Sequence, residues 1–204
     1  MRFLAFLAVL CLMGTGASAL TENQNQLLTR VEDAFSEVRT MTADFSQSAS
    51  SGDTATGKLY LAKPGRLKMQ YDPPSSFEIL ANGKNFIYYD KAADQTTHID
   101  ISQTTANLIL RDRLSFRDPG LRVESVREKG GVAEISVSQT DDSLAGSITL
   151  VFAMTPVRLI GWRITDAQGI TTQVELANQR SNVAVADAMF RYINPRLKTK
   201  LPGD

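Results

Sequence analysis

Apolar positions recur every three or four residues between residues 22 and 38. The apolar side chains of this segment are Leu27, Leu28, Val31, Ala34, Phe35 and Val38. This spacing places them on one face of an amphipathic helix. Thr21 stands just before the segment, and we expect it to cap the first turn. We expect the acidic pair Glu32-Asp33 on the outer, solvated face of the helix.

After residue 41 the apolar period changes to two, which is typical of strands with one buried face. Leu67, Met69 and Tyr71, for example, alternate with polar residues. About eight or more short segments of this kind follow one another, and turn sequences such as Pro64-Gly65 and Gly130-Gly131 separate them. The pattern therefore predicts a protein made mainly of β-strands.

The clearest hairpin signal is Asn82-Gly83, which separates the apolar segments 77–80 and 86–89. A type I′ turn needs positive φ at both central residues, and this dipeptide tolerates it well. Antiparallel pairing follows. With few helices between the strands, consecutive strands should pair as a meander, giving a broad sheet that twists and curls on itself.

Residues 104–111 interrupt the strand pattern, because Ala106, Leu108, Ile109 and Leu110 are bunched between polar ends. We expect a short helix here. A curled sheet exposes an apolar concave face, and this helix and the 22–38 helix are the two candidates to cover it. The sequence thus predicts a mainly β fold with helices (α+β), in which a strongly curved antiparallel sheet carries a helical lid.

The apolar residues expected on the strand faces are an unusual mixture of flexible and aromatic side chains. They are Leu67, Met69, Tyr71, Ile79, Phe86, Tyr88 and Trp162. Such residues form ordinary packed cores, but they also line pockets that adapt to acyl chains of differing shape. The pattern alone leaves both interpretations open.

The first 19 residues have the features of a secretory signal peptide. Arg2 precedes an apolar run that ends at Met13, and small residues up to Ala19 form a cleavage site. Its removal leaves one expected domain, residues 20–204, and also removes Cys11, the single cysteine. The sequence therefore predicts an exported, periplasmic protein that is held together by burial and without disulfides.

Charge and motifs argue against several functional classes. The 22 Lys and Arg residues balance 22 Asp and Glu residues, which argues against a nucleic-acid binder held by phosphate contacts. His98 is the single histidine, so a zinc site of clustered His and Cys ligands is excluded. There is no nucleophile elbow and no glycine-rich nucleotide motif. We therefore assign no catalytic residue, no metal and no cofactor, and we expect a protein that is not an enzyme.

Several stretches together resemble the LolA family of periplasmic outer-membrane lipoprotein carriers. They are Met41-Thr-Ala-Asp-Phe45-Ser-Gln47, the runs 57–73 and 82–95, and the shorter matches 108–110, 164–171 and 187–195. Their order and spacing both fit the family. The resemblance implies an incomplete antiparallel β-barrel whose apolar concave face is covered by helices.

The resemblance also implies a function and its partners. Such carriers accept triacylated lipoproteins from the inner-membrane Lol ABC transporter, shield the acyl chains in a cavity and deliver the cargo to LolB or another outer-membrane acceptor. We expect a monomer that performs no covalent chemistry. The alternative is a periplasmic module on the same scaffold that senses lipid or lipoprotein and signals to a membrane partner. A lipid-ester hydrolase would need a reactive group near His98, for which the sequence gives no support.

The residues that the resemblance implicates fall on the predicted lid and the predicted sheet. We expect Val31, Phe35 and Val38 of the first helix, with Leu108 and Leu110 of the second, to face the sheet. The sheet residues of this acyl-chain cavity are Leu67, Met69, Tyr71, Ile79, Phe86 and Tyr88.

One position departs from the family pattern in a way that affects the lid. An arginine commonly precedes the proline of this stretch in the family and closes the lid by donating to backbone carbonyls. Here the residue is Lys63, our latch candidate. Lysine has three donors on a flexible stem instead of a rigid fork, so the latch is expected to be looser or shared with another residue such as Arg66. The alternative is that Lys63 is an ordinary surface lysine. Some members also carry Trp where this chain has Met69, which would make the cavity softer.

Overall fold

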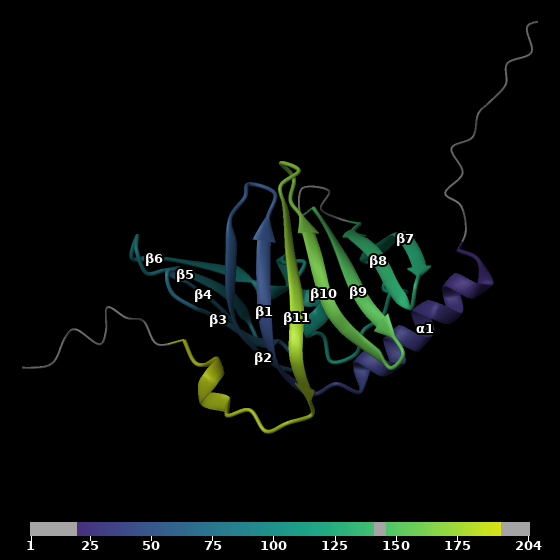
Figure 1. Cartoon of the computed structure of the whole chain (residues 1–204), viewed down its shortest axis with the longest axis horizontal. Helices are drawn as coiled ribbons and strands as arrows, with labels where there is room; N and C mark the ends of the chain where they lie inside the picture. The colour runs from purple at the N-terminus through teal and green to yellow at the C-terminus, as the bar shows by residue number, and fades with distance from the viewer. Residues whose placement is uncertain (1–19, 141–145, 193–204) are drawn as a thin grey trace, which may run out of the picture.

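The molecule is built on one antiparallel sheet of 11 strands, seen in a computed structural model that describes residues 20–140 and 146–192. The predicted signal peptide, residues 1–19, lies outside the described residues. The strand order is β6-β5-β4-β3-β2-β1-β11-β10-β9-β8-β7. The sheet curves strongly, and β1 and β11 run along its convex back (Figure 1). The predicted fold class is confirmed.

The chain runs outward from the centre of the sheet to one edge and then returns from the other edge. The outward strands are β1 (Thr40–Ala49), β2 (Thr54–Ala62), β3 (Arg66–Tyr71), β4 (Phe77–Asn82), β5 (Asn85–Asp90) and β6 (Gln95–Asp100). The returning strands are β7 (Leu121–Lys129), β8 (Val132–Gln139), β9 (Ser147–Met154), β10 (Val157–Thr165) and β11 (Thr171–Ser181). The predicted meander is confirmed within each half. The pairing of β1 with β11, which joins the halves, was not predicted.

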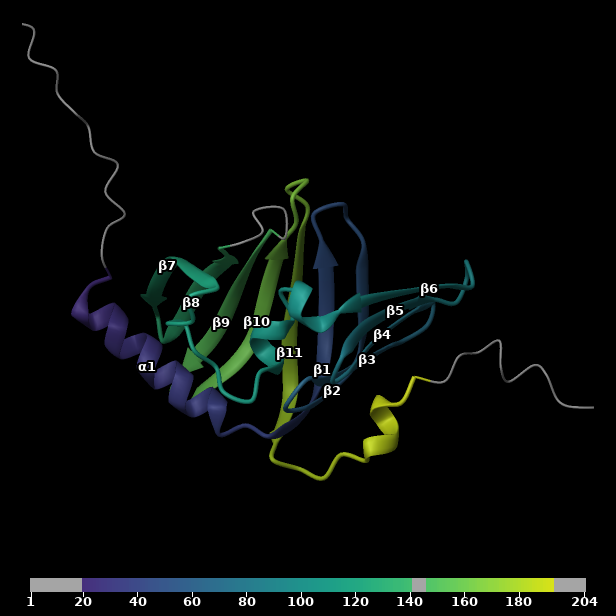
Figure 2. The same ribbon diagram turned by 180° about the vertical axis from the view of Figure 1, so that it is seen from behind.

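Residues 101–120, which we call the crossing segment, carry the chain from β6 to β7 across the concave side (Figure 2). The segment contains η1 (Ile101–Gln103) and α2 (Asn107–Leu110). α2 confirms the short helix expected over residues 104–111, but at half the length. The amide of Gly65 donates to the carbonyl of Leu110 at 2.7 Å, which fastens the segment to the β2–β3 turn.

α1 (Glu22–Ser36) confirms the first predicted helix and its cap. The Thr21 Oγ1 accepts from the Gln24 amide at 3.3 Å, and the Gln24 side chain accepts from the Thr21 amide at 2.9 Å. This reciprocal capping box satisfies two backbone donors at the helix start. α1 packs on β10, and its Phe35 ring meets Phe152 of the neighbouring strand β9 edge to face at 5.9 Å. The helix therefore covers the β7–β10 half of the concave side (Figure 2).

Glu32 is buried, so the prediction that it lies on the solvated face of α1 is wrong. Its side chain accepts from the Phe116 amide at 2.6 Å and pairs with the Arg117 guanidinium, also at 2.6 Å. These partners lie in the crossing segment, far along the chain, and the helical pattern carries no sign of them. Asp33, by contrast, is exposed as expected. Glu32 thereby binds α1 to the crossing segment.

The hairpin at Asn82-Gly83 is confirmed, but the turn is not the predicted type. Gly83 has φ of +97°, whereas Asn82 is the last residue of β4 and has no positive φ. The Asn82 Oδ1 instead accepts from the amides of Lys84 and Asn85, at 3.1 and 2.9 Å. The asparagine side chain, rather than a left-handed backbone, closes this turn.

After β11 the chain leaves the sheet and forms one more short helix, η3 (Asp187–Phe190). η3 lies against β3 and β4. The Arg66 guanidinium pairs with Asp187 at 2.5 Å, and Phe190 is buried. This contact brings the end of the described chain back to the first half of the sheet.

The substitution Glu32→Gln should lower the free energy of unfolding by about 1–3 kcal/mol. The glutamine amide would place an N–H group where the carboxylate now accepts from the Phe116 amide and the Arg117 guanidinium, so that donors would face each other. Urea denaturation of the purified protein measures the change. Asp33→Asn is the matched control, and this exposed change should stay within about 0.5 kcal/mol of wild type. Equal stability of the two variants would show that the buried carboxylate does not hold the crossing segment.

Candidate binding cavity

An open cavity of about 910 Å³ lies on the concave side, next to the crossing segment. Its apolar wall on one side comes from β3–β5 and the loop before β4, through Leu67, Met69, Phe77, Ile79, Phe86 and Tyr88. The opposite wall comes from β9–β11, through Ile148, Trp162, Ile164 and Val174. Ala106 and Ile109 line it from the crossing segment. Sites for small molecules commonly enclose about 300–1,000 Å³, so this cavity is large enough for an organic ligand.

The structure places every sheet residue of the predicted cavity in this lining. They are Leu67, Met69, Tyr71, Ile79, Phe86 and Tyr88. Leu67 and Met69 are buried at the base, and the other four are partly exposed. The alternating pattern had placed them on one face, and the curvature of the sheet turns that face into a hollow.

The predicted lid residues lie elsewhere, so the expected facing of α1 toward β3 needs correction. Val31 and Phe35 are buried in the core, and Val38 packs against that core. Leu108 and Leu110 are buried as well. Within the described chain, no residue of α1 lines the cavity. The reason is that α1 packs on β10, in the other half of the sheet, where the concave side is filled.

Several lining residues were absent from the predicted site. Ile148, Ile164 and Val174 belong to alternating strands that the sequence shows clearly, and Trp162 had been noted as a strand-face residue. What the pattern lacked was the pairing of β1 with β11, which brings β9 and β10 around to face β3–β5. Ala106 and Ile109 line the cavity in place of Leu108 and Leu110; they stand three residues apart, the spacing of one helical face.

Gly57 makes room for an aromatic pair in the cavity wall. It lies in register between Phe45 of β1 and Tyr71 of β3. A Cβ at this position would lie 2.1 Å from the carbonyl oxygen of Gln70 and 2.8 Å from the Phe45 ring. Because the glycine has none, Phe45 and Tyr71 pack edge to face with their centroids 5.0 Å apart.

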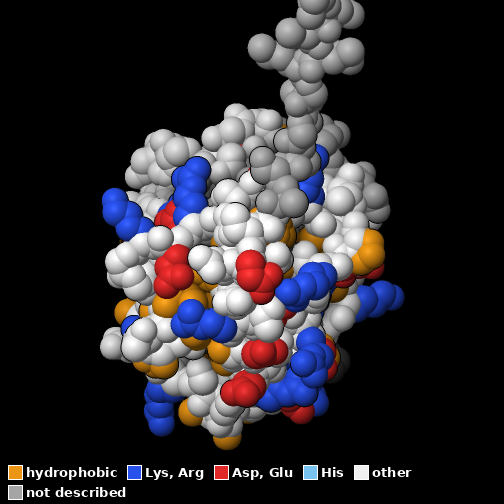
Figure 3. All heavy atoms as spheres, turned by 90° about the vertical axis from the view of Figure 1, so that its right-hand side faces the viewer, with side chains coloured by type: hydrophobic (Ala, Val, Ile, Leu, Met, Phe, Trp, Pro, Cys, Tyr) orange, Lys and Arg blue, Asp and Glu red, His pale blue; other side chains and the backbone are white. Residues whose placement is uncertain are grey.

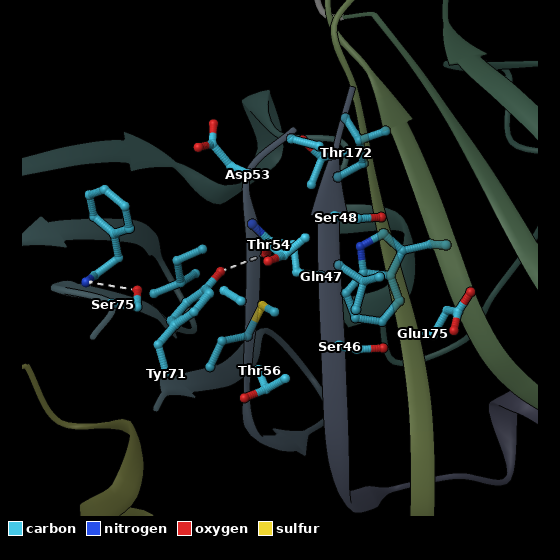
Figure 4. Close-up of a pocket in the computed structure, with 18 of the residues that line it drawn as sticks. Ser46, Gln47, Ser48, Asp53, Thr54, Thr56, Tyr71, Ser75, Thr172 and Glu175 are labelled. Carbon is cyan, nitrogen blue, oxygen red and sulfur yellow. Dashed lines mark hydrogen bonds between the residues drawn. The ribbon is translucent and has the colours of Figure 1, made fainter. Parts of the chain in front are cut away.

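Tyr71 also forms a polar contact at the edge of this apolar surface. Its hydroxyl donates to the Gln47 Oε1 at 2.8 Å, and Figure 4 shows the two side chains pointing toward each other. Burial raises the pKa of Tyr71 well above its usual value, so the phenol stays protonated and keeps its donor.

Lys63 joins the sheet to the end of α1. It follows β2, and its Nζ donates to the carbonyl of Phe35 at 2.7 Å while lying 3.6 Å from the centroid of the Phe35 ring. The carbonyls at a helix C-terminus carry partial negative charge, which favours a cation there. Lys63 is only 6% exposed, and this burial lowers its pKa to about 8.

Further contacts bind the crossing segment to α1. The amide of Leu114 donates to the Ser36 hydroxyl at 3.1 Å, and the Arg117 guanidinium donates to the Thr29 hydroxyl at 3.0 Å. Acidic and basic side chains are interspersed on the molecular face at this end, without a large area of one sign (Figure 3). The hydrogen bonds of Leu114 and Arg117 to α1 thus make α1 and the crossing segment one connected cover.

Comparison with known proteins places this architecture in a family. The profile described as "Outer membrane lipoprotein carrier protein LolA" matches residues 36–193, which is most of the chain. The chain belongs to the LolA family. No helix among the described residues is long and apolar enough to span a membrane.

Individual relatives match at low identity but over nearly their whole length. An outer-membrane lipoprotein carrier protein from Methylococcus capsulatus is 25% identical over 202 residues, covering 95% of this chain and 94% of the relative. An uncharacterized protein, RP864, from Rickettsia prowazekii is 26% identical over 198 residues, covering 97% and 90%. Among solved structures, the LolA superfamily protein NE2245 from Nitrosomonas europaea superposes with a TM-score of 0.47 at 12% identity, covering 81% of this chain and 97% of its own.

Membership of the LolA family gives Lys63 particular interest, since it stands where the resemblance places the lid-closing arginine. Its side chain does reach a backbone carbonyl of α1, as that role requires. A single ammonium makes this contact, instead of the two-pronged contact open to a guanidinium. Lys63 thus contacts the last turn of α1 by one hydrogen bond and one ring contact.

Burial of Lys63 should make the protein more stable as the pH rises from about 8 to 10.5. The pKa of Lys63 is about 8 when folded and 10.5 as the ordinary value, so the unfolded chain binds more protons in this range. The cost of burying a charged amine is full below pH 8 and is relieved above it. Chemical denaturation should show the free energy of unfolding of wild type rising relative to that of Lys63→Met.

Lys58→Met is the control for this pH dependence. Lys58 is exposed, and its hydrogen bond with Asp44 raises the pKa of Lys58 instead of lowering it. The difference between wild type and this control should therefore not rise over the same range. A pH-independent difference between wild type and Lys63→Met would show that Lys63 is not buried as a shifted amine.

Proposed function

We propose that this protein is a periplasmic carrier that shields the acyl chains of lipoproteins in its concave cavity. It accepts triacylated lipoproteins from the inner-membrane Lol ABC transporter and delivers them to LolB or another outer-membrane acceptor. The observation that carries the proposal is the apolar cavity of about 910 Å³ in a chain of the LolA family. Beside it lies a cover, formed by α1 and the crossing segment, that polar contacts hold in place. The relative from Methylococcus capsulatus bears the name of such a carrier.

The energetics of acyl-chain burial require a cover that competes with the cargo. Each buried methylene group contributes about 0.8 kcal/mol, so a fully buried chain would be held too tightly for release. In this protein α1 fills the second half of the concave side with Leu28, Val31 and Phe35. Long chains enter by displacing α1, which exchanges its own apolar contacts for theirs and so keeps the net affinity moderate.

Displacement of α1 must also break the hydrogen bond from Lys63 to the carbonyl of Phe35. A hydrogen bond from a charged donor contributes about 1.5–3 kcal/mol, which a few buried methylene groups can offset. The cost of burying the charged amine offsets part of this energy, so the latch adds to the apolar packing that keeps α1 on β10 when the protein is empty. It is weak enough to open when acyl chains arrive.

The proposed role is shielding, which requires no catalytic residue. His98 lies on the exposed strand β6, where its ring contacts Tyr192 at 5.4 Å, and it is not among the described residues that line the cavity. The lining is mainly apolar, and its hydroxyl groups come from serines, threonines and tyrosines without a neighbouring histidine. We propose that transfer proceeds by binding and release.

Purified protein added to spheroplasts should release a newly made outer-membrane lipoprotein into the soluble fraction as a one-to-one complex. The variant Ile79→Glu should abolish release, because a carboxylate among acyl chains has no partner. Ile170→Glu is the matched control, since Ile170 is 46% exposed, and it should behave as wild type. Absence of release by wild type would contradict the carrier function, and release by Ile79→Glu would contradict the assignment of the cavity.

The variant Lys63→Leu should change delivery to the acceptor more than uptake of cargo. Without the latch, α1 returns to β10 less readily and displaces bound acyl chains less effectively. The rates of uptake from spheroplasts and of transfer to acceptor-containing membranes measure the two steps, with Lys58→Leu as an exposed control. Equal loss of both steps would show that Lys63 serves overall stability rather than closure.

A further inference from the structure

The concave face changes from apolar to polar near the same end of two of its strands. Along β1, Met41, Ala43 and Phe45 are 2–4% exposed, and the next residue on this face is the partly exposed Gln47. β3 repeats the change, because its buried apolar positions end at the partly exposed Tyr71. Gln47 and Tyr71 therefore mark the boundary between the apolar base of the cavity and its rim.

The Gln47 amide lies with its carbonyl oxygen toward the Tyr71 hydroxyl. Tyr71 donates to Oε1 at 2.8 Å, which occupies the acceptor side of the amide (Figure 4). Within the described chain, no hydrogen bond engages the Gln47 Nε2. The amide thus keeps two N–H donors at the edge of an apolar cavity, and a ligand with a suitably placed acceptor can use them.

We infer that Gln47, positioned by Tyr71, donates a hydrogen bond to the ester or amide carbonyl at the head of an acyl chain bound in the cavity. The inference rests on the proposed function and specifies its ligand. An acyl chain that fills the apolar base has its carbonyl at the chain's polar end, which is the level at which Gln47 lies. A carbonyl withdrawn from water there without a donor would weaken binding, and Gln47 supplies the donor.

The charges around the cavity narrow the ligand class further. Its charged lining residues are all acidic, namely Asp53, Asp72 and Glu175. Among the described residues that line the cavity there is no lysine and no arginine. A fatty-acid carboxylate or a lipid phosphate would find no cation to pair with, and an unpaired anion at the edge of an apolar site is costly. The preferred ligand is therefore an acyl ester or amide with an uncharged head group.

The test compares two lipids that differ in their carbonyl groups. Dioctanoylglycerol, a diester, and dioctylglycerol, its diether analogue, compete with a fluorescent apolar probe bound to the purified protein. We expect the diester to bind about three- to tenfold more tightly, as one hydrogen bond allows. Gln47→Leu should reduce this ratio to about one. Gln70→Leu, the same change at an exposed position outside the cavity lining, should leave it unchanged.

A ratio of about one for wild type, or an unchanged ratio in Gln47→Leu, overturns the inference while the carrier function stands. Failure of both lipids to displace the probe from wild type contradicts the carrier function itself. Tyr71→Phe gives an independent test, because it removes the positioning hydroxyl and keeps the ring against Phe45. This variant should lower the ratio without loss of diether binding, and an unchanged ratio counts against the inference.

A third lipid tests the head-group charge. Dioctanoyl phosphatidate has the same chains and esters as the diester but carries a phosphate group. We expect it to bind at least about tenfold more weakly than the diester, because the cavity offers the phosphate no cation. Equal or tighter binding would overturn the uncharged ligand class.

Discussion

The apolar concave face of an open, curved sheet must be kept from water, and the rest of the molecule follows from this constraint. The sheet is continuous because β11 pairs with β1, and this pairing leaves β6 and β7 as the two free edges. The chain must therefore travel from one edge to the other between β6 and β7. Residues 101–120 form this connection and cross the concave side of the sheet. The connection that the topology requires therefore also covers the apolar face.

The two halves of the concave side meet this constraint in different ways. Over β7–β10 the hollow is filled, because α1 inserts Leu28, Val31 and Phe35 against the sheet. Over β1–β5 the cover is thinner, and Ala106 and Ile109 leave a cavity beneath them. A protein that needed only stability would fill both halves. The unfilled half, lined by Met and aromatic side chains that adapt to different shapes, is the feature that favours ligand binding.

The features that the sequence could predict are those carried by local patterns. Thr21 and Gln24 stand at the spacing of a capping box, and the alternation of Leu67, Met69 and Tyr71 shows which side chains share a face. The position of α1 over β10 depends instead on contacts between distant segments. Glu32 looked like a solvated residue because its partner, Arg117, lies 85 residues away.

The same limit applies to the candidate site. The sequence shows that Lys63 is a basic residue before a proline, but only the fold brings it to the carbonyl of Phe35. Likewise, Gln47 stands in a strand with alternating polarity, and nothing local shows that Tyr71 will reach it from β3. The same holds for Gly57, which makes room for Tyr71 against Phe45 because it has no Cβ. Its role is visible only once the neighbouring strands are in register.

The contacts that fasten the cover also determine how it can open. α1 is held to the sheet by apolar packing and by Lys63, and it is held to the crossing segment by Glu32, Ser36 and Thr29. Lifting α1 alone would leave the buried carboxylate of Glu32 without its donors, at a cost comparable to that of the latch itself. Moving α1 and the crossing segment together preserves the bonds between them, and the polar contacts that it breaks are those to the sheet, such as Lys63 to Phe35 and the Gly65 amide to Leu110. Acyl chains can replace apolar contacts but cannot replace the donors of Glu32, so ligand entry favours movement of the cover as one unit.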